Sequence, residues 1–143
     1  MARILYGAPE SEREEENGLV VRLRKKHTVE YLNDFLGFAW ELSRCKNSRL
    51  LPQKYDLVVY DTKSYGENWL PEVRAEHFKS TITPYFEKKE TPIIILADAE
   101  IKDEIEDWIE KHAFHCLAQP YSIDEAVEKV NSLLPKARRK KQQ

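Results

Sequence analysis

The stretch Lys54-Tyr55-Asp56-Leu57-Val58-Val59-Tyr60-Asp61 decides the fold of this chain. From Leu57 to Tyr60 it is a run of four apolar or aromatic residues, two of them β-branched, with an acidic residue on each side. The run is too short for a helix and is typical of a central strand buried on both faces of a parallel sheet. Open parallel sheets place their sites at the carboxyl ends of their strands. We therefore expect Asp61 to lie at the rim of the sheet, either as a group that takes part in chemistry or as a cap for the following loop.

Predicted strands and helices alternate on both sides of this run. The predicted strands span residues 3–7, 28–32, 57–60, 91–96 and 114–118, and helices are expected between them and after the last one. Ser11 with Glu14 and Ser122 with Glu125 have the spacing of helix capping boxes, and Asn33 and Asp98 are predicted to cap two further helices. The helix expected over residues 71–89 is interrupted by Pro84, and its predicted apolar positions are Val73, Phe78, Ile82, Tyr85 and Phe86. This alternation predicts a parallel sheet with helices on both faces.

Three stretches of the chain, in order, resemble the receiver domain of two-component response regulators, and the likeness covers residues 3–134. Residues 55–61 resemble the strand that ends in the phospho-accepting aspartate, and residues 92–96 resemble the fourth strand. Residues 116–122 resemble the end of the fifth strand, where the family normally has Lys-Pro-Phe. The resemblance implies a flavodoxin-like, three-layer α/β/α fold whose five-stranded parallel sheet has the order 2-1-3-4-5. We expect a receiver-like domain over residues 1–135 and a basic, disordered tail over residues 136–143.

The chain departs from the family at the positions that carry its chemistry. Asp61 matches the phospho-acceptor, but Ala8 and Pro9 replace the acidic pair that holds the metal. Ala97 replaces the hydroxyl residue that follows the fourth strand in the family, and Gln119 replaces the family's lysine. Cys116 replaces the aromatic residue of the fifth strand. Donors that stabilise charge in a transition state each contribute roughly 3–4 kcal/mol. Losing several of them predicts phosphorylation at background level only. The sequence therefore favours a degenerate member, a pseudo-receiver that is not an enzyme and has no cofactor and no metal site.

Three functions remain open at this point. The first is a phosphorylation-independent signalling or regulatory module that binds a protein partner, or its own copy, through the surface from Asp98 to Leu134. The second is a working receiver phosphorylated on Asp61 with a rearranged magnesium site, in which Glu10 or Glu12 replaces the missing acidic pair. The third is a nucleic-acid-associated protein that uses the tail, whose binding would weaken steeply with salt. Because the chain ends shortly after its last predicted helix, we expect it to act by docking.

Aromatic residues are the candidates for an interaction surface, since Trp and Tyr are typical of binding hot spots. The candidates are Tyr65, Trp69, Trp108 and Tyr121. Trp40 lies off the apolar stripe of its helix, so it belongs either to an interface or to a wider buried face. His112, His115 and Cys116 could suggest a metal site, but neighbouring strand residues point to opposite faces, and we expect His112 to complement the end of a helix instead.

Composition narrows the classes of protein further. The net charge is −2 overall, and the tail holds five cations, so residues 1–135 carry −7, which argues against a nucleic-acid-binding face on the domain itself. Two distant cysteines predict neither a disulfide framework nor a zinc site. No phosphate-binding glycine loop or hydrolase motif occurs. No apolar run is long enough to span a membrane and no signal peptide is evident, so we expect a cytoplasmic protein.

Overall fold

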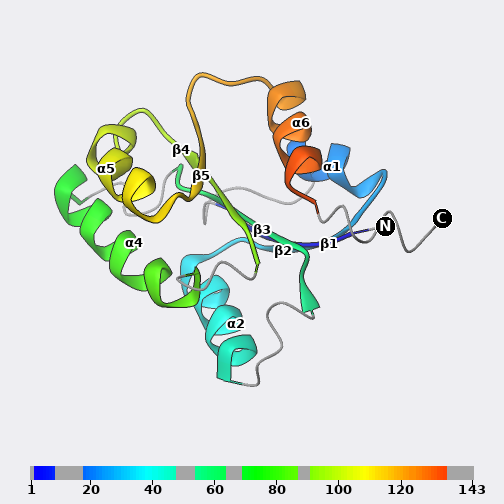
Figure 1. Ribbon diagram of the computed structural model, residues 1–143, viewed down its shortest axis with the longest axis horizontal. Helices are drawn as coiled ribbons and strands as arrows, with labels where there is room; N and C mark the ends of the chain where they lie inside the picture. Colours follow the sequence, from blue (N-terminus) through cyan, green and yellow to red (C-terminus); the bar gives the residue numbers. More distant parts are fainter. Residues whose placement is uncertain (1, 9–17, 48–53, 64–68, 87–90, 135–143) are drawn as a thin grey trace.

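Five parallel strands form one sheet in the order β2-β1-β3-β4-β5 (Figure 1). The computed structural model describes residues 2–8, 18–47, 54–63, 69–86 and 91–134. Its strands are β1 (Arg3–Gly7), β2 (Thr28–Leu32), β3 (Leu57–Asp61), β4 (Ile93–Ala97) and β5 (His115–Ala118). Every neighbouring pair is parallel, with Ile4 beside Leu57 and Val58 beside Ile93. The predicted sheet and its strand order are confirmed.

Helices cover both faces of the sheet, so the predicted three layers are also confirmed (Figure 1). One face carries α1 (Gly18–Arg24) and α6 (Ile123–Leu133), and the other carries α2 (Phe35–Asn47), α4 (Pro71–Phe86) and α5 (Lys102–His112). None of the helices that the structure describes is long and apolar enough to cross a bilayer. The predicted tail lies outside the described residues.

The central strands are buried because both of their faces are covered. Every residue of β3 and of β4 is buried, whereas the edge strands β2 and β5 alternate or are half-exposed. Gly7 ends β1 at a point of close approach: a Cβ atom there would lie 2.5 Å from the Tyr60 ring and 2.6 Å from the Phe38 ring. A glycine at this position therefore allows α2 to pack closely on the carboxyl end of the sheet.

The helix boundaries confirm some of the predicted caps and correct others. The Ser122–Glu125 capping box is present, with Glu125 N donating to Ser122 Oγ at 3.0 Å. The cap of α2 is Asp34 and not Asn33. The Asp34 carboxylate accepts a hydrogen bond from the backbone N–H of Gly37, three residues later. Helix α4 includes Pro84 and ends two residues later. The predicted Ser11–Glu14 box lies outside the described residues.

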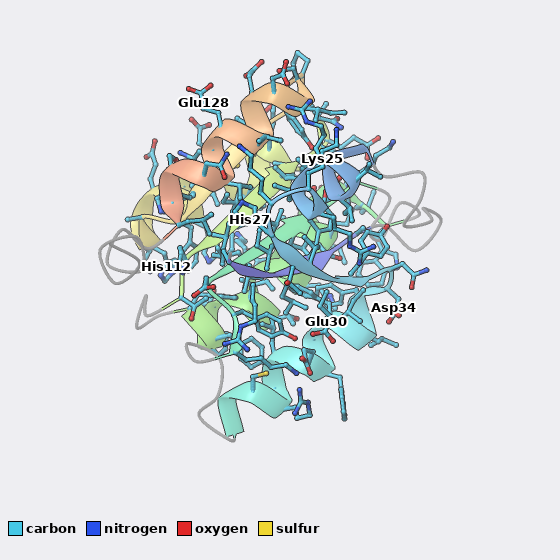
Figure 2. All side chains as sticks on the ribbon, turned by 90° about the vertical axis from the view of Figure 1, so that its right-hand side faces the viewer. Lys25, His27, Glu30, Asp34, His112 and Glu128 are labelled. Carbon is cyan, nitrogen blue, oxygen red and sulfur yellow. The ribbon has the colours of Figure 1, made fainter. Side chains whose placement is uncertain are left out.

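A polar cluster holds α2 to the start of β3. Glu41 on α2 is 5% exposed, and its carboxylate accepts hydrogen bonds from Lys54 at 2.8 Å and Arg44 at 2.9 Å, and from the Tyr55 hydroxyl. The same hydroxyl contacts Glu30, which projects from β2 toward α2 (Figure 2). Burial by itself would raise the pKa of Glu41, but these three hydrogen bonds together outweigh it and lower the pKa below the ordinary value of 4.5.

This lowered pKa predicts an acid-sensitive contribution to stability. The ionised Glu41 stabilises the fold fully above pH 4.5, its unfolded value, and the contribution is lost as the pH falls from there through the folded pKa. We expect Glu41→Gln to lower the free energy of unfolding near neutral pH and to flatten its decline in acid, as measured by urea unfolding at a series of pH values. Glu128→Gln is the control, because Glu128 is exposed on α6 (Figure 2), and this variant is expected to keep the wild-type pH profile. An unchanged profile in Glu41→Gln would contradict the assignment.

Candidate functional site

The carboxyl ends of β1, β3 and β5 border an open cavity of about 420 Å³, here called the carboxyl-edge cavity. It lies on the face of the sheet that α1 and α6 cover, because Asp61 points to the same side as Leu57 and Val59. Its lining residues are Tyr6, Gly18, Leu19, Asp61, Lys63, Gln119, Pro120, Tyr121, Ile123 and Ala126. The structure thus brings together three of the predicted site residues: Asp61, Gln119 and Tyr121.

Asp61 caps its own loop at this edge. The residue is 8% exposed, and its Oδ1 accepts a hydrogen bond from the backbone N–H of Lys63 at 2.9 Å. This i to i+2 contact is an Asx turn, which fixes the chain as it leaves the strand. The loop-cap role expected for Asp61 is therefore present in the structure.

Two further predicted site positions, at the carboxyl ends of β1 and β4, do not line the cavity. Ala8 is buried, and its N–H donates to Leu32 O at 3.0 Å, which ties the end of β1 to β2. Ala97 is fully buried in the cluster beneath α2, α4 and α5, and its carbonyl accepts from Gln119 N at 3.0 Å. Pro9 lies outside the described residues. Neither alanine has a polar side chain to offer a ligand.

Cys116 is not part of the cavity. It is half-buried and packs toward the opposite face of the sheet, against the cluster that α2, α4 and α5 cover. Burial raises the pKa of its thiol, so the neutral form is favoured.

A lysine that the sequence analysis did not consider borders the same cavity as Asp61. Lys63 follows Asp61 by two residues, and its side chain is exposed. The sequence could have indicated Lys63 as a site residue, because a residue two positions after a rim carboxylate stays in the same turn. The cavity therefore holds one carboxylate and one cation from a single loop.

A buried arginine joins the ends of β3 and β4. Arg74 of α4 is 2% exposed, its Nη2 donates to Thr62 O at 2.8 Å, and it forms an ion pair with Asp98. Thr62 is fully buried, and its hydroxyl accepts from Asp98 N at 3.0 Å. Asp98 also accepts from Ile101 N at 3.0 Å, so it caps the turn that leads into α5. We call Arg74, Asp98 and Thr62 the Arg74 clamp.

The buried face of α4 differs from the predicted one. Val73, expected in the core, is 51% exposed, and Arg74 takes the buried side instead. The signal was the spacing of Arg74, Phe78 and Ile82 at i, i+4 and i+8, which puts an arginine on the apolar stripe. The burial of Arg74 was not predicted, because a buried guanidinium needs a partner that only the tertiary structure supplies.

Solved structures resemble this chain closely enough to identify its fold. One of them belongs to a novel family of redox sensors in the streptococci that evolved from two-component response regulators. It superposes with a TM-score of 0.57 at 21% identity, over 93% of this chain and 51% of that chain. The inactive regulatory domain of the repressor of iron transport regulator matches with a TM-score of 0.56 at 20% identity, over 92% of this chain and 94% of that domain. The chemotaxis protein CheY4 of Vibrio cholerae matches with 0.58 at 18% identity, over 94% and 99%. The chain has the receiver fold.

The receiver fold predicted from three short stretches is thereby confirmed. No protein-family model matches the chain, and no curated protein matches it in sequence. The chain spans about half the length of the streptococcal redox sensor.

Receivers hold a magnesium ion at the carboxyl edge, as the family resemblance implies, and the described residues do not fit one. Mg²⁺ prefers several oxygen ligands in an octahedral arrangement. The cavity lining supplies a single carboxylate, from Asp61, and the Asp98 carboxylate is engaged by Arg74. No group of three or more His, Cys, Asp or Glu side chains among the described residues is placed to hold a metal ion. Glu10 and Glu12, the predicted replacement ligands, lie outside those residues.

The predicted interaction aromatics have separate locations in this receiver fold. Trp69 is 45% exposed and meets the His77 ring edge-on, with the ring centroids 5.3 Å apart. Tyr121 is half-buried at the cavity, and Tyr65 lies outside the described residues. Trp40, left open by the sequence, is 66% exposed, so it is not part of a wider buried face.

The prediction that Trp108 belongs to an interaction surface is wrong, because Trp108 is a core residue. It is 8% exposed, its ring packs against Phe78 and Phe114, and its Nε1 donates to Thr83 Oγ1 at 2.9 Å. The residue lies on the side of α5 that faces α4. His112 ends α5 as expected and stacks on Phe114.

Proposed function

We propose that this chain is a phosphorylation-independent pseudo-receiver that acts as a regulatory protein–protein interaction module. The observation that carries the proposal is the composition of the carboxyl edge. Asp61 is retained there, but the positions of the hydroxyl and the lysine that would take charge from phosphoryl oxygens are Ala97 and Gln119. Without those groups the transition state for phosphoryl transfer to Asp61 loses its main stabilisation.

The contacts of the retained groups support the same proposal. The Asp61 carboxylate accepts the Lys63 N–H, and the Arg74 clamp ties the turn after β4 to the end of β3. Interactions among buried charged groups are costly to break, because each partner would be left unpaired in a poorly solvated site. An edge held in this way suits a constant docking surface better than a switch.

The experiment that tests the proposal is an amide-resolved NMR titration with magnesium and then with beryllofluoride, a mimic of a phosphoryl group. We expect no concentration-dependent shifts at Asp61, Ala97 and Gln119 at millimolar magnesium. Asp61→Asn is the control, since any shift that depends on the acceptor carboxylate disappears in it. Shifts in the wild type that are absent from Asp61→Asn and spread to β5 would sink the proposal.

A working receiver is the second candidate, and Lys63 is the observation that favours it. Its cation borders the cavity that Asp61 lines, so it could take the charge role of the lysine that Gln119 replaces. In that case beryllofluoride would shift the amides of the wild type, and Lys63→Ala would abolish the shifts. This pair of outcomes separates the two candidates.

Redox sensing, the property named for the streptococcal relative, finds little support in the thiols of this chain. Cys45 is fully buried and Cys116 is half-buried, and burial raises the pKa of both thiols. The thiolate is the reactive form, and reactive cysteines are usually accessible with a lowered pKa. We therefore do not extend that property to this chain.

A further inference from the structure

The carboxyl-edge cavity is large enough to hold a small organic molecule. Its volume of about 420 Å³ lies within the range of roughly 300–1,000 Å³ that is common for ligand pockets in proteins. It also lies at the carboxyl ends of the parallel strands, where open α/β sheets bind their ligands. The residues that line it therefore indicate which chemical class of ligand would fit.

Two opposite charges from a single turn border the cavity. Asp61 ends β3, and Lys63 follows two residues later, with its backbone N–H donating to Asp61 Oδ1 at 2.9 Å. The two side chains do not pair with each other, because none of the ion pairs between described residues involves Lys63. The cavity thus offers an anionic and a cationic group that leave the backbone close together.

The rest of the lining is largely apolar and comes from other elements. Leu19 belongs to α1, Ile123 and Ala126 belong to α6, and Pro120 and Tyr121 precede α6. Leu19 and Ala126 are buried, whereas Ile123 is 44% exposed, so this apolar wall runs from the core to the surface. A wall of this kind suits an apolar side chain on a ligand.

The two charges restrict the ligand to a molecule that carries both signs. Asp61 is 8% exposed, so a ligand that covers it removes its remaining contact with water, which is costly unless a cation takes the place of that water. A simple anion such as phosphate would face the Asp61 carboxylate, and a simple amine would face the Lys63 ammonium. Like charges brought together in this way cost free energy. A molecule with an ammonium and a carboxylate on neighbouring atoms satisfies both groups.

We propose that the carboxyl-edge cavity binds a free α-amino acid with a large apolar side chain. The ammonium of the ligand pairs with Asp61, its carboxylate pairs with Lys63, and its side chain packs on the apolar wall. An α-amino acid carries both charged groups on one carbon, which matches two partners that come from one turn. The inference rests on the proposed function in one respect, because Asp61 pairs with a ligand cation only while it carries no phosphoryl group.

The test is an amide-resolved NMR titration of the full chain with L-phenylalanine, without magnesium. We expect saturable shifts at Lys63, Gln119 and Ala126, with a dissociation constant of roughly 1 mM. Three analogues each lack one recognised group: hydrocinnamate has no ammonium, phenethylamine has no carboxylate, and glycine has no apolar side chain. Each is expected to bind at least about tenfold more weakly than L-phenylalanine.

Two substitutions assign the charged groups of the ligand to their partners. Asp61→Asn keeps an acceptor oxygen for the Lys63 N–H, and Lys63→Met keeps most of the length of the side chain. In Asp61→Asn we expect L-phenylalanine to bind no better than hydrocinnamate, and in Lys63→Met no better than phenethylamine. This loss of discrimination reports each charge pair, and a merely structural role of either residue would not produce it.

Ile123→Ser and Val73→Ser are a matched pair of variants. Each shortens an exposed apolar residue in the first turn of a helix, but only Ile123 lines the cavity. We expect Ile123→Ser to weaken the binding of L-phenylalanine about threefold or more, and Val73→Ser to leave it unchanged.

Two results would overturn the inference. One is the absence of saturable shifts at any soluble concentration of L-phenylalanine, and the other is binding of hydrocinnamate or phenethylamine to the wild type as tight as that of L-phenylalanine. None of these titrations contains magnesium or beryllofluoride, so the proposed function stands or falls separately by the beryllofluoride titration.

Discussion

Replacing Arg74 by methionine is expected to cost about 3–5 kcal/mol of the free energy of unfolding. The guanidinium is 2% exposed, and Asp98, the Thr62 carbonyl and, at 3.4 Å, Glu100 pair with it in place of water. Methionine fills much of the same volume but leaves the Asp98 carboxylate, itself 9% exposed, without its cation. Urea unfolding of Arg74→Met and wild type measures the difference.

An exposed ion pair gives the control for this experiment. Arg22 pairs with Asp124 at 2.9 Å, and the two side chains are 42% and 81% exposed. We expect Arg22→Met to cost no more than about 1 kcal/mol, since exposed pairs contribute little. The double variant Arg74→Met/Asp98→Asn should recover part of the loss, because the buried charge is removed with its partner. If Arg74→Met costs as little as Arg22→Met, the clamp does not hold the edge of the sheet.

Replacing Trp108 by alanine is the other change with a large expected effect, again about 3–5 kcal/mol of the free energy of unfolding. The indole fills the space between α4, α5 and the segment before β5, with its ring centroid 5.8 Å from that of Phe78 and 5.1 Å from that of Phe114. Alanine would leave a cavity there and would also remove the donor to Thr83 Oγ1. Thermal and urea unfolding measure the loss.

Trp40→Ala is the matched control for the tryptophan experiment. Trp40 is 66% exposed, so its removal is expected to change the free energy of unfolding by about 0.5 kcal/mol or less. Equal losses in the two variants would contradict the assignment of Trp108 to the core and of Trp40 to the surface.

The receiver positions of the site were predictable because they follow strands. A run such as Leu57–Tyr60 identifies a buried strand by itself, and the residue after it must then lie at the carboxyl edge. Asp61 and Gln119 accordingly line one cavity in the structure. Cys116 was matched to the family only through the resemblance of residues 116–122, and its side chain faces away from that cavity.

The amino-acid sequence alone predicted the alternation of strands and helices and the parallel sheet, because both follow from local hydrophobic periodicity. The strand order, and the replacement of the family's hydroxyl and lysine by Ala97 and Gln119, were implied by the resemblance to receivers. Which face each side chain meets depends on the tertiary structure. Arg74 is buried because Asp98 and Thr62, distant in sequence, converge on it, whereas Trp40 and Val73 stay exposed because no described element covers them. Burial of a charge and exposure of an apolar group both depend on neighbours brought together by the fold, and a local pattern does not contain those neighbours.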